Sequence, residues 1–140
     1  MSPCVVDAST IAAAFFQEEF EQRSWELLAS GCLLLAPDLL FAEVANVVSK
    51  RFRRKQIDAQ EAHLIISDLR KIPLKITSSE SLVEPALEIA LTTGRSAYDS
   101  IYLALAVRTD STMVTEDKRL INALADSSLE KHVEWLGAVR

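Results

Sequence analysis

The stretch Ala97-Tyr98-Asp99-Ser100-Ile101-Tyr102-Leu103-Ala104-Leu105-Ala106-Val107 is apolar on nearly every face of a helix, and Asp99 is its only charge. A helix of this composition is predicted to be buried. Ser96 suits the N-cap position, so we expect a helix over residues 97–108. The run Thr112-Met113-Val114-Thr115 follows and predicts a strand. A buried helix that leads into an apolar strand indicates an α/β fold.

The same alternation of short apolar strands and longer helices runs through the rest of the chain. Further strands are predicted at residues 4–6, 32–36, 74–76 and 132–135. Helices are predicted at residues 11–16, 19–28, 38–52, 59–70 and 117–125, and between Ser78 or Ser79 and Gly94. Because the strands are apolar throughout, they favour a parallel sheet covered on both faces. The predicted fold class is α/β, a three-layer α/β/α sandwich with a small parallel sheet, in one domain over residues 1–140.

The composition is that of a globular intracellular protein, with 49% apolar and 25% charged residues. Cys4 and Cys32 lie in apolar segments outside any metal-binding spacing, so we expect reduced, buried thiols. The sequence has neither a signal-peptide pattern nor an apolar run of membrane-spanning length, so we expect a cytoplasmic protein without a membrane partner. A net charge of -5 argues against a protein that coats nucleic acid through bulk electrostatics.

Three carboxylates stand where the apolar pattern predicts buried side chains. Asp7 directly follows the first strand, Glu43 lies in the apolar stripe of the helix at 38–52, and Asp99 lies in the buried helix. Burying an unpaired carboxylate is costly, so three of them indicate a shared partner. Mg2+ and Mn2+ prefer oxygen ligands and fit this role. The sequence therefore predicts a divalent-metal site.

Asp117 is the fourth candidate ligand. It follows the strand at 112–115, just as Asp7 follows the first strand. Ligands collect at the carboxyl ends of the strands in open parallel sheets, so the two acids share an edge if their strands are neighbours. The hydroxyls of Ser9 and Thr115 are placed to hold a water or the metal.

Each acid also has a purely structural alternative. Asp7, or Ser9 in its place, could cap the first helix, and Asp117 could cap the helix at 117–125. Asp99 could simply favour the helix dipole from the first turn, and Glu43 could pair with a buried Lys or Arg. These alternatives leave unexplained why the acids interrupt apolar segments.

Four segments, in order, resemble the PIN-domain ribonucleases, and particularly the short VapC-like toxins of type II toxin–antitoxin pairs. They are Val5-Val6-Asp7-Ala8-Ser9, Pro37-Asp38-Leu39-Leu40-Phe41-Ala42-Glu43-Val44-Ala45-Asn46, Tyr98-Asp99-Ser100-Ile101-Tyr102-Leu103-Ala104-Leu105-Ala106 and Val114-Thr115-Glu116-Asp117. The resemblance implies a PIN-like sandwich, Mg2+ or Mn2+, an RNA substrate, a homodimer and a cognate antitoxin. Glu116 departs from the family's pattern by adding a negative charge near the site.

The chemistry expected of such a site is hydrolysis of RNA phosphodiester bonds by a metal-activated water. We expect Asp7 and Asp99 to bind the metal directly, and Glu43 and Asp117 to bind it directly or through waters. His63 and His132 lie far from the acids in sequence, and we expect them to be structural.

A basic run is the candidate RNA contact in this acidic chain. It consists of Lys50, Arg51, Arg53, Arg54 and Lys55 around Phe52, and Arg95 before the Asp99 helix is a further candidate. The run could instead be a solvated helix end that favours the dipole, or it could dock an acidic antitoxin segment. The aromatic residues Phe15, Phe16, Phe20 and Trp25 are expected in the core, with part of an antitoxin groove as the alternative.

Other acidic magnesium domains fit less well. A response-regulator receiver needs paired acids after its first strand, and Asp7 has no acidic neighbour. A haloacid-dehalogenase-type phosphatase needs Asp-x-Asp, whereas the chain has Asp7-Ala8-Ser9. Two further alternatives stay open, a PIN-fold nuclease of housekeeping RNA processing and a binding module with a degenerate site.

Overall fold

The computed structural model describes residues 3–16 and 19–138. Within them, five strands form one parallel sheet in the order β3-β2-β1-β4-β5. The strands are β1 (Cys4–Val6), β2 (Leu34–Pro37), β3 (Leu74–Thr77), β4 (Thr112–Thr115) and β5 (Val133–Trp135). β1 and β2 are fully buried and β4 nearly so, while the edge strands β3 and β5 are partly exposed. The parallel sheet predicted from the apolar runs is confirmed.

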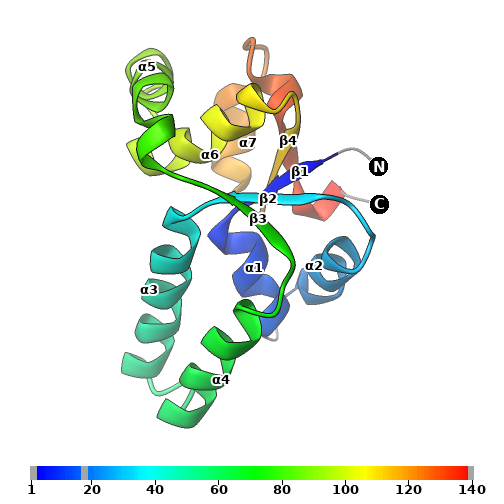
Figure 1. The fold of residues 1–140 in the computed structure, drawn as a ribbon, viewed down its shortest axis with the longest axis vertical. Coiled ribbons are helices and arrows are strands. Elements are labelled where there is room, and N and C mark those ends of the chain that lie inside the picture. The colour runs from blue at the N-terminus through cyan, green and yellow to red at the C-terminus, as the bar shows by residue number, and fades with distance from the viewer. Residues whose placement is uncertain (1–2, 17–18, 139–140) are drawn as a thin grey trace.

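Helices cover both faces of this sheet (Figure 1). They are α1 (Ala8–Phe15), α2 (Glu21–Leu28), α3 (Leu39–Arg53), α4 (Ala59–Leu69), α5 (Val83–Thr93), α6 (Ala97–Arg108) and α7 (Lys118–Leu124), with short 3-10 turns at Glu80–Leu82, Glu130–His132 and Leu136–Ala138. Figure 1 shows α1 to α4 on one side of the sheet and α5 and α6 on the other. The three-layer α/β/α sandwich is therefore confirmed.

The buried helix α6 packs against β1, β2 and β4, and its residues Tyr102 to Ala106 are all buried. Its bounds and those of β4 are the predicted ones. Ser96 caps α6 through a bond from the Asp99 amide (3.0 Å), and Gly94 ends α5 in the left-handed conformation (φ 74°). Pro85 lies in the first turn of α5, where its missing amide hydrogen costs no helix bond.

Some predicted boundaries were wrong by a few residues. The first helix begins at Ala8 instead of residue 11, because Asp7 caps it. Asp38 takes the N-cap position of α3, but its side chain makes no capping hydrogen bond. The Asp38 side chain bonds to the Ser79 amide (3.0 Å), while the Ser79 hydroxyl accepts from the Leu39 amide (3.1 Å). α3 is therefore tied to the segment after β3 through a residue distant in sequence.

The two cysteines form no disulfide, as expected. Cys4 is buried, Cys32 is partly exposed, and their sulfur atoms lie 3.8 Å apart. His132 is buried with Nδ1 2.8 Å from the Ser111 carbonyl, and His63 is exposed on α4, so neither lies among the acids. None of the helices in the described part of the chain is long and apolar enough to cross a membrane.

Candidate active site

Asp7 lies at the carboxyl end of β1, in the middle of the sheet. Its Oδ1 accepts hydrogen bonds from the Ser9 hydroxyl (2.7 Å) and the Thr10 amide (2.9 Å), and its Oδ2 accepts one from the Thr115 hydroxyl (2.6 Å). Asp7 is only 8% exposed. Burial raises its pKa, and the hydrogen bonds offset part of that rise. Asp7 is thus both the cap of α1 and a buried carboxylate held by three hydrogen bonds.

Glu43 faces the same region from α3, where it is half-buried. Its Oε1 accepts a 2.6 Å hydrogen bond from the hydroxyl of Tyr102, a buried residue of α6. Burial raises the pKa of Glu43, the Tyr102 bond lowers it, and the charges of Asp7 and Asp99 raise it again. Burial and Glu43 also raise the pKa of Tyr102, so Tyr102 stays protonated and donates. This neutral partner leaves the Glu43 charge uncompensated.

Asp99 lies in the first turn of α6 and is half-buried. Burial raises its pKa first, followed by the charges of Asp117 and Asp7, while Arg95 lowers it. The Nε of Arg95 is buried and has no hydrogen-bond partner among the described residues. Asp99 is therefore close enough to two other carboxylates and one guanidinium to respond to their charges.

Asp117 follows β4 at the edge of this group and is exposed. Its Oδ1 accepts hydrogen bonds from the amides of Arg119 (3.0 Å) and Leu120 (3.3 Å), so it caps α7 as the structural alternative supposed. Its own amide donates to the Thr115 hydroxyl (3.1 Å), which also bonds to Asp7. Asp117 can therefore cap α7 and still lie beside Asp7.

The fold brings the four predicted acids together at the carboxyl ends of the central strands β1 and β4. They come from β1, α3, α6 and the end of β4, and their charges act on one another. Within the described residues, no three Asp, Glu, His or Cys side chains are already arranged as an ion site. The donor chemistry nevertheless fits Mg2+ or Mn2+, because burial raises the pKa of Asp7, Glu43 and Asp99, and repulsion from neighbouring carboxylates raises the pKa of Glu43 and Asp99 further. A divalent cation would compensate that charge.

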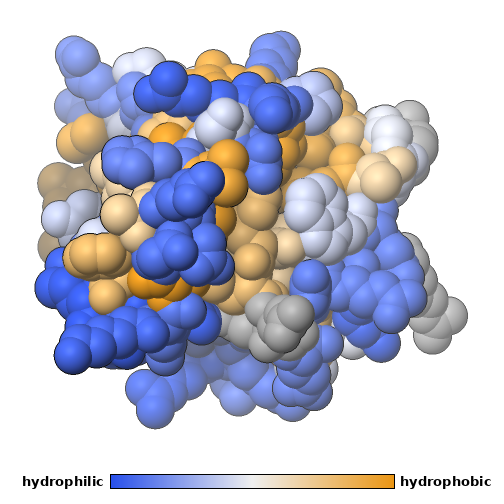
Figure 2. Space-filling model, turned by 90° about the horizontal axis from the view of Figure 1, so that it is seen from below, coloured by the Kyte–Doolittle hydropathy of each residue, from blue (hydrophilic) through white to orange (hydrophobic). Residues whose placement is uncertain are grey.

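The basic run lies at the opposite end of α3 from Glu43. Lys50, Arg51 and Arg53 occupy the last turn of the helix, and Arg54 and Lys55 follow it. At about 1.5 Å of rise per residue, Arg51 lies roughly 12 Å along the helix from Glu43. Its guanidinium stacks 4.2 Å from the centroid of the Phe16 ring. Figure 2 shows this end of the molecule as a largely hydrophilic surface with apolar patches.

The aromatic residues of the first two helices mainly pack among themselves and on the core. Phe15 and Trp25 meet edge to face with centroids 5.6 Å apart, and Phe16 is buried. Phe20 meets the ring of Trp135 in the same way at 5.3 Å. Trp25 keeps 43% of its surface exposed, so it alone of these four presents a large exposed face.

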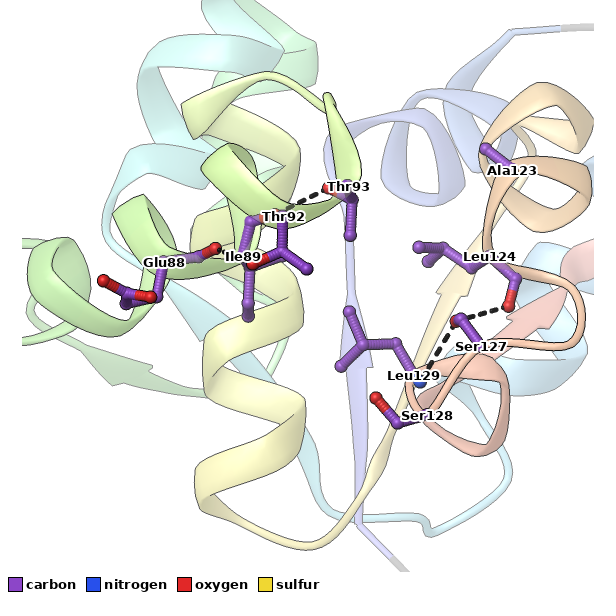
Figure 3. A pocket seen from close by; sticks show the side chains of 9 residues that line it. All are labelled: Glu88, Ile89, Thr92, Thr93, Ala123, Leu124, Ser127, Ser128 and Leu129. Atoms are coloured by element: carbon purple, nitrogen blue, oxygen red, sulfur yellow. Dashed lines mark hydrogen bonds between the residues drawn. The ribbon is translucent and has the colours of Figure 1, made fainter.

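A hollow of about 410 Å³ lies between α5 on one side and the end of α7 with the segment that follows it on the other (Figure 3). Its walls include Ile89 and Thr93 of α5 and Leu124 and Leu129 from the other side. Glu88 is the one charged residue in this lining, and none of the four acids takes part in it. This hollow is therefore separate from the acid cluster.

Tyr102 and Thr10 support the site without having been assigned a role from the sequence. Tyr102 stands three residues after Asp99, a spacing that places both on one helix face and could have indicated a shared environment. Thr10 donates its amide to Asp7 and its hydroxyl to the Val114 carbonyl (2.9 Å), which joins α1 to β4. That second bond depends on two segments distant in sequence, so no local pattern predicts it.

Solved structures share this fold. A protein of Pyrobaculum aerophilum, PAE2754, superimposes with a TM-score of 0.68 at 21% identity, over 97% of this chain and 85% of that one. The Mycobacterium tuberculosis toxin VapC20, described as cleaving the sarcin-ricin loop, gives 0.65 at 14% identity over 81% and 87%. VapBC2 of Rickettsia felis, bound to a fragment of its promoter DNA, gives 0.62 at 15% identity over 94% and 97%.

The sequence comparisons agree with the fold. The chain is 33% identical over 118 residues to Ribonuclease VapC3 of Pyrobaculum aerophilum, a match that covers 83% of this chain and 90% of that protein. The family model described as the PIN domain matches residues 4–125, which include all four acids. The chain therefore belongs to the PIN-domain family, with a VapC ribonuclease among its relatives there.

Proposed function

We propose that this protein is a divalent-metal-dependent endoribonuclease and the toxin of a toxin–antitoxin pair. The observation that carries the proposal is the convergence of Asp7, Glu43, Asp99 and Asp117 on one sheet edge, with raised pKa values for the first three. A relative that is a VapC ribonuclease supports the reaction class. The complete set of acids disfavours a degenerate binding module, while a housekeeping nuclease stays the alternative.

Each side chain would have a distinct task. Asp7 and Asp99 would hold Mg2+ or Mn2+, with Glu43 and Asp117 binding directly or through waters. When bound, the ion lowers the pKa of a water and offsets negative charge on the phosphate. Ser9 and Thr115 keep Asp7 in place through the bonds at 2.7 and 2.6 Å.

We propose Arg95 as a cation that contacts the RNA backbone beside the acids. It lies close enough to Asp99 to lower the pKa of that acid, and its buried Nε has no hydrogen-bond partner within the described residues. A phosphate oxygen at this point would receive a charge-assisted hydrogen bond. Arg95 would thereby bring the anionic substrate to an otherwise acidic site.

The basic run would bind RNA farther from the cleavage point. Its residues Lys50, Arg51, Arg53, Arg54 and Lys55 lie at the far end of α3, so they would contact phosphates several nucleotides away. The double variant Arg53→Gln/Arg54→Gln should raise KM about three- to tenfold with little change in kcat, and should flatten the salt dependence of binding. An unchanged KM at every salt concentration would remove the run from the RNA interface.

The partners are proposed from the relatives and from two apolar surfaces. Trp25, Leu28, Ile72 and Pro73 line a mostly apolar groove of about 330 Å³, which fits the apolar face of an antitoxin helix. Val83, Leu87 and Leu91 of α5 are exposed at four-residue spacing, so they form one face that a homodimer could cover. We place the protein in the cytoplasm, where its RNA substrate is.

The proposal is tested by incubating the purified protein with cellular RNA in Mn2+ or in EDTA. We expect internal cleavage that EDTA abolishes and that Asp99→Asn reduces strongly. Asp126→Asn is the matched control, because Asp126 is exposed and lies at a positive φ of 63° that Asn tolerates. Cleavage that persists in EDTA would contradict the metal-dependent reaction. Sequencing the cleaved ends identifies the target, and co-expression with the product of a neighbouring short reading frame tests the toxin assignment.

A further inference from the structure

Trp135, the last residue of β5, lies beside Thr115 of β4 in the sheet register. Its indole is enclosed on several sides. The Lys118 Nζ lies 4.4 Å from the ring centroid, and the Phe20 ring meets it edge to face. A Cβ atom added to Gly137 would lie 2.7 to 2.8 Å from three ring atoms, so Gly137 permits a close approach that any other residue would block. These contacts therefore fix the position of the indole.

In this position the indole contacts the backbone of Glu116, next to the acid cluster. Its Nε1 donates to the Glu116 carbonyl (3.3 Å). The Glu116 amide donates to the Ser9 hydroxyl (3.1 Å), and that hydroxyl donates to Oδ1 of Asp7 (2.7 Å). Both the N–H and the C=O of Glu116 are therefore held, one from the side of Asp7 and the other by Trp135.

Glu116 stands between two residues of the site. Thr115 bonds to Oδ2 of Asp7 (2.6 Å) and accepts from the amide of Asp117 (3.1 Å). A displacement of the Glu116 carbonyl would therefore move Asp117 and loosen the contacts that orient Asp7. Groups that orient ligands in this indirect way affect metal affinity although they do not touch the metal.

We propose that Trp135, which packs against Gly137, is a positioning residue for the acid cluster. It acts through the Glu116 carbonyl on the turn that joins Thr115 to Asp117. The family match ends at residue 125, so the contact comes from a part of the chain outside that match. The inference rests on the proposed function, because it assigns a role within the same metal site.

The test uses Trp135→Phe, which keeps an aromatic ring in this position and removes the N–H donor. Mn2+ affinity measured by calorimetry should fall about three- to tenfold, the size of effect expected when one hydrogen bond is lost. Amide hydrogen exchange at Glu116 and Asp117, measured by NMR, should accelerate by a similar factor. Gly137→Ala should reproduce both effects, because its Cβ displaces the ring while the donor remains.

Val133→Ala is the matched control in the same strand. Val133 packs on the core, so the truncation should lower the Tm while Mn2+ affinity and exchange at Glu116 and Asp117 stay as in the wild type. Unchanged affinity and exchange in folded Trp135→Phe would overturn the inference, and so would equal losses in Val133→Ala. A wild-type protein without metal-dependent cleavage would instead contradict the proposed function, and the exchange comparison would still decide whether Trp135 holds the turn.

Discussion

Both ends of the parallel sheet bury ionisable side chains. Burial favours an uncharged thiol at one end, whereas at the other end it acts on a group of acids that repel one another when ionised. At the amino end, Cys4 and Cys32 place their sulfur atoms 3.8 Å apart, and burial raises the pKa of Cys4 to about 12. At the carboxyl end, burial likewise raises the pKa of Asp7, Glu43 and Asp99. The buried Cys4 thiol is neutral at physiological pH, whereas carboxyls begin from values near 4 and repel one another once ionised.

This difference supports the proposal that the functional site lies at the carboxyl end of the sheet. A neutral buried thiol such as that of Cys4 needs no charged partner beyond ordinary packing. Clustered carboxylates destabilise the fold unless an external charge compensates them, and here their hydrogen-bond donors fix position without supplying positive charge. The carboxyl end thus retains an electrostatic cost that a bound cation would remove.

The largest expected effect is on catalysis by Asp99→Asn. Removing one carboxylate from the proposed metal site should lower RNA cleavage at least about 100-fold, the scale seen when one charge-stabilising group is lost from an active site. The same change should raise the Tm of the metal-free protein by a few degrees, because it removes a half-buried charge and its repulsion with Asp117 and Asp7. Initial cleavage rates and thermal unfolding check the two parts. A variant that loses both activity and stability would point to a structural role instead.

The second prediction concerns pH. Because the folded-state pKa of Asp99 lies above its unfolded value of about 3.8, the folded state binds more protons in the interval between them. Stability from this group is therefore lost as pH rises through that interval. The Tm advantage of Asp99→Asn over the wild type in EDTA should grow from pH 4 upward, and Mn2+ at neutral pH should cancel it. An advantage independent of pH would be incompatible with the assigned repulsion.

A smaller effect is expected for Tyr102→Phe. The variant removes the 2.6 Å bond to Glu43 and leaves a half-buried carboxylate without that donor. Losing the partner of a charged group costs about 1 to 3 kcal/mol, so metal affinity or kcat/KM should fall roughly 5- to 100-fold. The pKa of Glu43 should rise further, because the bond lowers it. A pH–rate profile that shifts toward higher pH would confirm this, whereas an unshifted profile would contradict it.

The smallest effect is expected at the other end of the sheet. Cys4→Ala removes a buried sulfur from the core and should lower the free energy of unfolding by about 1 kcal/mol. RNA cleavage and its dependence on Mn2+ should stay within twofold of the wild type. Chemical denaturation and the standard cleavage assay measure the two quantities. Altered metal dependence in Cys4→Ala would break the contrast between the two ends.

Much of the fold follows from local pattern. The apolar run at Thr112–Thr115 and the largely apolar helix Ala97–Arg108 have the predicted bounds, because few alternatives suit such stretches. Asp38 shows what local sequence pattern cannot predict. Its residue type suits a helix cap, yet its side chain bonds to Ser79, which becomes its neighbour only when β3 pairs with β2. Contacts of this kind depend on the tertiary fold and leave no local signal.

The candidate site was predictable to a similar degree. Asp7, Glu43 and Asp99 were detectable because each interrupts an apolar segment, and the fold places them together. The basic run was visible as well, but only the structure shows that it lies at the far end of α3 from Glu43. The link from Trp135 to Glu116 could not be predicted, because it depends on β5 lying beside β4 and on close packing against Gly137.

The most direct measurement of the central claim is anomalous diffraction from crystals of the wild-type protein grown with Mn2+. We expect an anomalous peak between Asp7 and Asp99, with oxygen ligands around it and the Glu43 carboxylate bound directly or through a water. The peak should disappear in Asp99→Asn crystals grown under the same conditions. Mn2+ bound elsewhere, or no peak at the acid cluster while the same preparation cleaves RNA in Mn2+, would contradict the proposed metal site.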